Sequence, residues 1–234
     1  MLDQAFESLK TYDWGTDRKP LAEIDNAVIV SHGEEAARKD LENRLAAVLK
    51  SDVSRDAKDF ACRKLMIIGT AASVPTLAEL LPDKDLAHMA RFALERIPAP
   101  EAAQALRNAL PKLNGPLKIG VIGSLGVRRD TESVASLARL LSDSDAAIAR
   151  AAAFALGDIR TSEAAAALSA MQSASSEVKP AVTDASLFCA EGLLADGKKG
   201  EALAVFKAYA GEGQPKHVRL AATKGMLACA GKKE

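Results

Sequence analysis

Histidine is the residue type in this chain best suited to bind a metal or to transfer protons, and its spacing predicts neither activity. His32, His88 and His217 are far apart, and none belongs to a His-Glu pair or a His-x-x-x-His spacing. A metal site needs ligands that converge on one point. Nothing in the spacing brings Ser31 and His32 beside Asp17 as a nucleophilic group. We therefore expect no catalytic residue, no metal and no cofactor.

The three cysteines are the next groups that could do chemistry. Cys62, Cys189 and Cys229 lie in apolar, helix-like runs without the C-x-x-C spacing of redox and zinc sites. This pattern is typical of cysteines that serve as small core residues. Their odd number argues against a disulfide framework. A single Cys189–Cys229 bridge stays open, because the two cysteines flank adjacent predicted repeats.

A glycine-containing run at residues 120–126 has a spacing that suggests a phosphate-binding loop. Such a loop follows a β-strand and opens a helix. No strand precedes Gly120, and the run falls inside a predicted repeat helix. We expect it to form a helix whose glycines allow close packing.

The loop at residues 12–19 concentrates the residue types that dominate protein-binding hot spots. Tyr12, Trp14 and Arg18 lie within seven positions, and Trp14 is the only tryptophan of the chain. Tryptophan, tyrosine and arginine are enriched in such hot spots. The alternative favoured by the usual packing of large aromatics is that Trp14 is buried between the first helix and the helices that follow. The sequence leaves both interpretations open.

Composition predicts an all-helical protein. The 234 residues are 48% hydrophobic, which is enough to fill a core, but only 4% aromatic. Alanine, the best helix former, is abundant. Equal numbers of basic and acidic residues give a net charge of zero, whereas nucleic-acid binding would need a basic excess. We therefore expect no nucleic-acid partner.

Hydropathy predicts a protein without membrane segments. No apolar stretch is long enough to span a bilayer. The first residues form an amphipathic pattern and lack the basic and apolar regions of a signal peptide. We expect no membrane partner and a cytoplasmic location for the sequence as written. The alternative is a periplasmic or exported protein from which a signal peptide has been removed.

The strongest pattern is an internal repeat of 31 residues. Predicted helix starts follow one another at this interval, and a later start at Lys216 comes after 38 residues. A fixed period of this length is typical of helical repeat proteins. The regular starts are Ser54, Asp85, Pro116, Ala147 and Val178.

Each repeat carries a second, leucine-containing helix with acidic or hydroxyl residues in its first turn. These residues suit the positive end of the helix dipole and the free amides there. The second helices are predicted at residues 73–81, 99–106, 131–137, 162–168 and 200–206. Helical spacing places several of their polar residues on the exposed side, where a partner would bind. These candidate protein-binding residues are Glu79, Gln104, Asn108, Arg139 and Gln172.

The repeat resembles a known family. An Asp-rich turn at Asp143 and Asp145 precedes Ile148, Arg150, paired alanines and an Ala-Leu-Gly ending at Gly157. This pattern is similar to HEAT-like repeats of the phycobilisome-lyase type. The resemblance covers residues 54–231, and it departs from the family at Pro98, where glycine is usual. It implies a right-handed α-solenoid of HEAT-like helical hairpins.

Small residues at the end of each first helix are expected to shape the hairpins. We expect Gly126 and Gly157 to end their helices in a left-handed conformation. Ala152 and Ala153 are expected to line a seam where neighbouring helices approach closely.

The chain is expected to have two parts. Residues 1–52 form an N-terminal helical cap with a degenerate first helix pair, and residues 53–234 form the repeat array. Helices in the first part are predicted at residues 3–11, 20–31 and 34–51. The segment at residues 11–18 resembles a lead-in found before HEAT arrays in some exported bacterial proteins.

These patterns favour a non-catalytic scaffold that binds another protein on the concave face formed by the second helices. DNA glycosylases of similar repeats need a basic, aromatic face, and HEAT-repeat hydroxylases need repeated His-Glu pairs; neither feature is present. Two alternatives stay open: a chromophore lyase or chaperone, and a docking domain of a larger exported bacterial enzyme.

Overall fold

A computed structural model describes residues 1–171 and 175–231. Within these residues the chain forms α-helices and short 3-10 helices, and it contains no strand. The all-α prediction is therefore confirmed. The chain divides into two compact units, Met1–Val121 and Ile122–Glu234, which are described separately.

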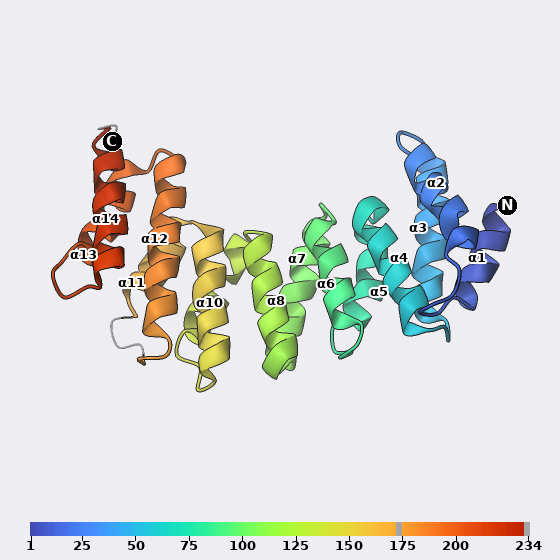
Figure 1. Ribbon diagram of the computed structural model, residues 1–234, viewed down its shortest axis with the longest axis horizontal. Helices are drawn as coiled ribbons and strands as arrows, with labels where there is room; N and C mark the ends of the chain where they lie inside the picture. The colour runs from blue at the N-terminus through green and yellow to red at the C-terminus, as the bar shows by residue number, and fades with distance from the viewer. Residues whose placement is uncertain (172–174, 232–234) are drawn as a thin grey trace. The chain divides into compact units, whose positions relative to one another are not determined.

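The first unit consists of helical hairpins that pack side by side (Figure 1). The first helices α2, α4 and α6 contact one another in sequence, as do the second helices α3, α5 and α7. Helix α8 crosses into the second unit. The helices are α1 (Leu2–Lys10), η1 (Lys19–Leu21), α2 (Ala22–Val30), α3 (Glu35–Lys50), α4 (Arg55–Ile68), η2 (Ala71–Ser73), α5 (Val74–Glu79), α6 (Ala87–Arg96), α7 (Pro100–Ala109), η3 (Leu110–Lys112) and α8 (Gly115–Val127).

The second unit repeats this arrangement. First helices α10, α12 and α14 pack in a row, and second helices α9, α11 and α13 pack in another. Each hairpin therefore buries its apolar side against its neighbours, as a repeat protein requires. The helices are η4 (Thr131–Ser133), α9 (Val134–Leu140), α10 (Ala146–Ile159), α11 (Ser162–Ser169), α12 (Lys179–Ala195), α13 (Lys199–Tyr209) and α14 (Lys216–Cys229).

The helix starts agree with the 31-residue period. Ser54 is the N-cap of α4, where its hydroxyl accepts a hydrogen bond of 3.0 Å from the Ala57 amide. Lys216 is the first residue of α14. Pro116, Ala147 and Val178 lie next to the first residues of α8, α10 and α12, and Asp85 lies in the turn before α6. The three helices predicted before residue 52 are also present, whereas their role as a cap stays a prediction.

The predicted role of two glycines as left-handed helix ends was wrong. Gly126 and Gly157 lie inside α8 and α10, and the left-handed residues are Arg129 and Arg160, with φ of 51° and 59°. A Cβ at Gly126 would lie 2.8 Å from the Cα of Ala155. The glycines are therefore needed because the next helix passes too close for a side chain.

A Cβ at Gly157 would likewise lie 3.1 Å from the Cα of Ala185 on α12. The run at residues 120–126 belongs to α8, as expected for a packing helix.

Ala152 and Ala153 are both completely buried within α10, while the close helix approach predicted at these two residues stays a prediction. Replacing either with leucine should lower the free energy of unfolding by about 1–3 kcal/mol, because a well-packed interior has no room for three more carbons. Thermal unfolding of Ala152→Leu and Ala153→Leu, followed by circular dichroism, would measure the loss. Unchanged unfolding in both variants would contradict the packing described for α10.

Candidate functional site

The loop that precedes α2 is held in a defined conformation by its own polar groups. The Asp13 carboxylate accepts a hydrogen bond of 2.9 Å from the Trp14 amide, and the Thr16 hydroxyl donates to the Asp13 carbonyl over 2.6 Å. The Asp17 carboxylate accepts another, of 3.0 Å, from the Lys19 amide. Aspartate and threonine commonly fix turns in this way. The loop therefore presents its aromatic residues in fixed positions.

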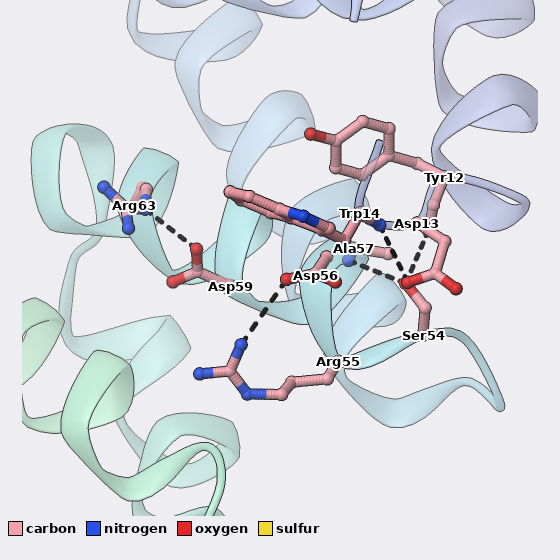
Figure 2. Close-up of polar contacts among 9 residues, drawn as sticks. All are labelled: Tyr12, Asp13, Trp14, Ser54, Arg55, Asp56, Ala57, Asp59 and Arg63. Carbon is pink, nitrogen blue, oxygen red and sulfur yellow. Dashed lines mark hydrogen bonds and ion pairs between the residues drawn. The ribbon is translucent and has the colours of Figure 1, made fainter. Parts of the chain in front are cut away.

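The same loop is attached to the start of α4 (Figure 2). The Ser54 hydroxyl, which caps α4, also donates a hydrogen bond to the Tyr12 carbonyl. The Tyr12 ring meets the Phe60 ring edge-on, with centroids 6.5 Å apart. One serine thus caps α4 and also holds the start of the loop, which explains why the loop lies along the first turns of α4.

Trp14 is exposed, so the interpretation that it is buried as a plug was wrong. Its relative accessibility is 87%, whereas that of Phe60 beneath the loop is 5%. Phe60 and Tyr12 already occupy the space between the loop and α4, and the Arg18 guanidinium lies 5.5 Å from the centre of the Phe60 ring.

A pocket of about 220 Å³ lies beside Trp14. Within it, Arg63 pairs with Asp59 at 2.9 Å, while Arg18 and Lys64 both pair with Asp25 of α2. The Arg18 and Arg63 side chains are exposed, whereas Lys64 and the two aspartates are largely covered. The pairs hold these charged groups beside the pocket. The lining residues are Tyr12, Trp14, Arg18, Asp56, Asp59, Phe60, Arg63 and Lys64.

The pocket brings together the three predicted residues of the loop and adds residues of α4 that the sequence analysis missed. Asp56, Asp59 and Arg63 lie more than forty positions after Trp14. Their only local signal is the i,i+4 spacing of Asp59 and Arg63, which is common on solvent-exposed helices. The hydrogen bond from Ser54 to Tyr12 and the contacts of Tyr12 and Arg18 with Phe60 link the two segments.

The predicted residues of the second helices are exposed where the structure describes them. Gln104 and Asn108 lie on α7, and the Gln104 amide donates a 2.8 Å hydrogen bond to the Asn108 carbonyl. Both line a groove of about 420 Å³ between α5 and α7. Glu79 is exposed on α5 outside this groove, Arg139 is exposed on α9 of the second unit, and Gln172 lies outside the described residues.

The groove and the Trp14 pocket share no lining residue. The predicted protein-binding residues are therefore divided among separate surfaces.

The cysteines are free thiols, so the open possibility of a Cys189–Cys229 bridge is not realised. Cys62 and Cys189 are buried, as expected of core residues. Burial raises the pKa of the Cys62 thiol to about 12 and that of Cys189 to about 11. An ordinary thiol has a pKa of about 8.5.

Cys229 should be the cysteine that reacts with iodoacetamide in the folded protein. Iodoacetamide reacts with the thiolate form of cysteine. At Cys62 and Cys189, burial keeps the thiol protonated and also keeps the reagent away from the sulfur. At about pH 8, mass spectrometry should find Cys229 alkylated and the other two unmodified. Denaturation should expose all three. Equal labelling of Cys62 in the native chain would contradict the buried thiol.

The His88 ring packs on Phe92 within α6, with centroids 4.2 Å apart. Across residues 1–171 and 175–231, no three histidine, cysteine or acidic side chains are placed to hold a metal ion. In the same part of the chain no helix is long and apolar enough to cross a membrane.

The paired helices, their 31-residue interval and the glycines at their crossings are features of a helical repeat protein. Residues 103–186 match the family of HEAT repeats. The match supports a HEAT-like repeat, while the phycobilisome-lyase type stays a prediction. A search among curated proteins found no match.

Solved structures with similar chains include two helical proteins. An engineered protein from the Northeast Structural Genomics Consortium has 19% sequence identity and a TM-score of 0.46, covering 98% of this chain and 69% of its own. Human deoxyhypusine hydroxylase in complex with glycerol has 15% identity and a TM-score of 0.36, covering 97% of this chain and 95% of its own.

Proposed function

We propose that this HEAT-like chain is a non-catalytic scaffold that binds another protein through the Trp14 loop. The observation that carries the proposal is the 87% accessibility of Trp14 in a loop whose conformation is fixed by hydrogen bonds. An exposed indole in water is unfavourable, and a partner that covers it gains apolar burial. Because the loop is already ordered, little conformational entropy is lost on binding.

The neighbours of Trp14 suit a protein partner. The Tyr12 ring and the Arg18 guanidinium line the same pocket, and these residue types commonly carry binding energy at interfaces. The charged pairs of α4 lie around the aromatic centre, and a polar rim around an apolar centre is typical of such contacts. The exposed polar residues of the second helices offer further contact surface on the scaffold.

A comparative pull-down from the source cells tests this proposal. The chain and its Trp14→Ala variant serve as baits, with Phe92→Ala as the matched control, because Phe92 is an exposed aromatic on α6 with 40% accessibility. We expect one or more proteins to be retained by the parent chain and the control but lost with Trp14→Ala. The effect expected for a hot-spot aromatic is at least 2 kcal/mol, or about thirtyfold in affinity.

Equal retention by all three baits would exclude the Trp14 loop as the binding surface. Titration with a tetrapyrrole, followed by absorbance, tests the chromophore lyase or chaperone alternative. A stoichiometric spectral shift would favour that alternative over the scaffold.

A further inference from the structure

The groove between α5 and α7 of the first unit is a second surface suited to binding a partner. Its floor is formed by the buried side chains of Val74, Leu81 and Leu113. Ala78 and Ala105 form parts of its walls, and their small side chains leave the space between the two helices open. A groove of about 420 Å³ is within the range of sites that bind ligands and peptide side chains.

The groove offers few hydrogen bonds to an occupant. Pro75 and Pro82 line one wall, and proline has no backbone N–H. On the other wall the Gln104 amide already donates to Asn108, and the Gln104 carbonyl accepts a 2.8 Å hydrogen bond from Arg107. An extended peptide would find few partners for its backbone groups along these two walls. A helix satisfies its backbone internally, so it needs only apolar contact.

Opposite charges mark the two ends of the groove. Glu101 lies in the first turn of α7, and Lys112 lies at the end of η3, eleven residues later. Both are exposed, and neither forms an ion pair with any residue that the structure describes. At about 1.5 Å per residue in α7 and about 2 Å per residue in η3, the backbone rises by about 18 Å between these two positions, or about three helical turns.

We propose that the α5–α7 groove binds an amphipathic helix of a partner protein. The helix spans about three turns and places apolar residues at i, i+3 or i+4, and i+7 on the groove floor. It carries a basic residue at the Glu101 end and an acidic residue at the Lys112 end. This surface is separate from the Trp14 loop, so either proposal can fail without the other.

Selection from a phage library of random peptides of about sixteen residues tests the form of the occupant. The full chain serves as target, with Ala105→Phe as counter-target because a phenylalanine ring fills the groove. Ala135→Phe, at an exposed position of α9, is the matched control. We expect enriched peptides with a helical apolar stripe that bind the parent and the control, and are lost with Ala105→Phe. Circular dichroism of each variant confirms that it is folded.

Enrichment of proline-rich or alternating sequences, or of no peptide at all, would overturn the helix proposal. Equal binding to Ala105→Phe would place the peptides elsewhere on the chain.

A charge-swap experiment tests the orientation, using an enriched peptide labelled with a fluorophore. Glu101→Lys should weaken its binding about fivefold, as expected when a surface ion pair becomes a repulsion. Changing the facing basic residue of the peptide to glutamate should restore binding to Glu101→Lys. The matched control is Glu201→Lys, which also changes a first-turn glutamate of a second helix, α13. Equal weakening by both variants, or failure of the peptide change to restore binding, would overturn the proposed orientation.

Discussion

Alanine in place of Gly126 should destabilise the second unit, whereas alanine in place of Gly123 on the same helix should stabilise it. A Cβ at Gly126 would lie 2.8 Å from the backbone of Ala155, closer than real atoms approach. A Cβ at Gly123 would have no atom within 4 Å. Both substitutions gain about 1 kcal/mol of helix propensity, but only Gly126→Ala must separate α8 from α10, at a cost of about 1–3 kcal/mol or more.

Chemical denaturation of the two variants measures the difference between these neighbouring positions. We expect Gly123→Ala to unfold at a higher denaturant concentration than the parent chain and Gly126→Ala at a lower one. Because both changes add the same methyl group to the same helix, propensity and composition cancel in the comparison. A gain of stability at both positions would contradict the close approach of α8 and α10.

Removal of the Glu42 carboxylate should cost about 3 kcal/mol of unfolding free energy. Glu42 of α3 is 3% accessible, and its carboxylate accepts hydrogen bonds from the Thr70 amide at 2.7 Å and the Thr70 hydroxyl at 2.9 Å. That hydroxyl in turn accepts from the Ala72 amide and begins η2. Glu42→Ala therefore removes the acceptor for a partly buried amide and loosens the turn between α4 and α5.

The measurement is thermal unfolding of Glu42→Ala beside Glu42→Gln and Lys39→Ala. The glutamine variant keeps one oxygen acceptor and should lose less than the alanine variant. Lys39 is an exposed position of the same helix, and its replacement should change stability by less than about 0.5 kcal/mol. A loss at Glu42 no larger than that at Lys39 would show that the hydrogen bonds to Thr70 contribute nothing net.

Helix positions could be predicted from the sequence because their signals are local. The Ser54 hydroxyl caps α4 by accepting a hydrogen bond from the amide of Ala57, three residues later. Lys216 begins α14 directly after Pro215. The two glycines illustrate the limit of such signals. A glycine near a predicted helix end indicates either a left-handed turn or a close crossing, and only the position of Ala155 decides between them. Glu42 was missed for a related reason, since a charged residue within a helix normally indicates an exposed face.

The candidate site was predictable in part. Helical periodicity was sufficient to place Gln104 and Asn108 on the exposed side of α7, and composition was sufficient to single out Trp14. The carboxylates beside Trp14 belong to α4, which meets the loop only through tertiary contacts such as that between Ser54 and Tyr12. The groove between α5 and α7 depends on how two separate helices pack. Neither arrangement has a signal at a fixed sequence spacing.

The position of Trp14 outside the core has a practical consequence for spectroscopy. The indole is the only one in the chain, and it reports on one surface loop. The emission maximum of Trp14 in the folded protein should therefore lie near that of indole in water. It should change little when the helices unfold. The same isolation makes it a sensitive optical label for anything that covers the loop, since no second indole contributes background.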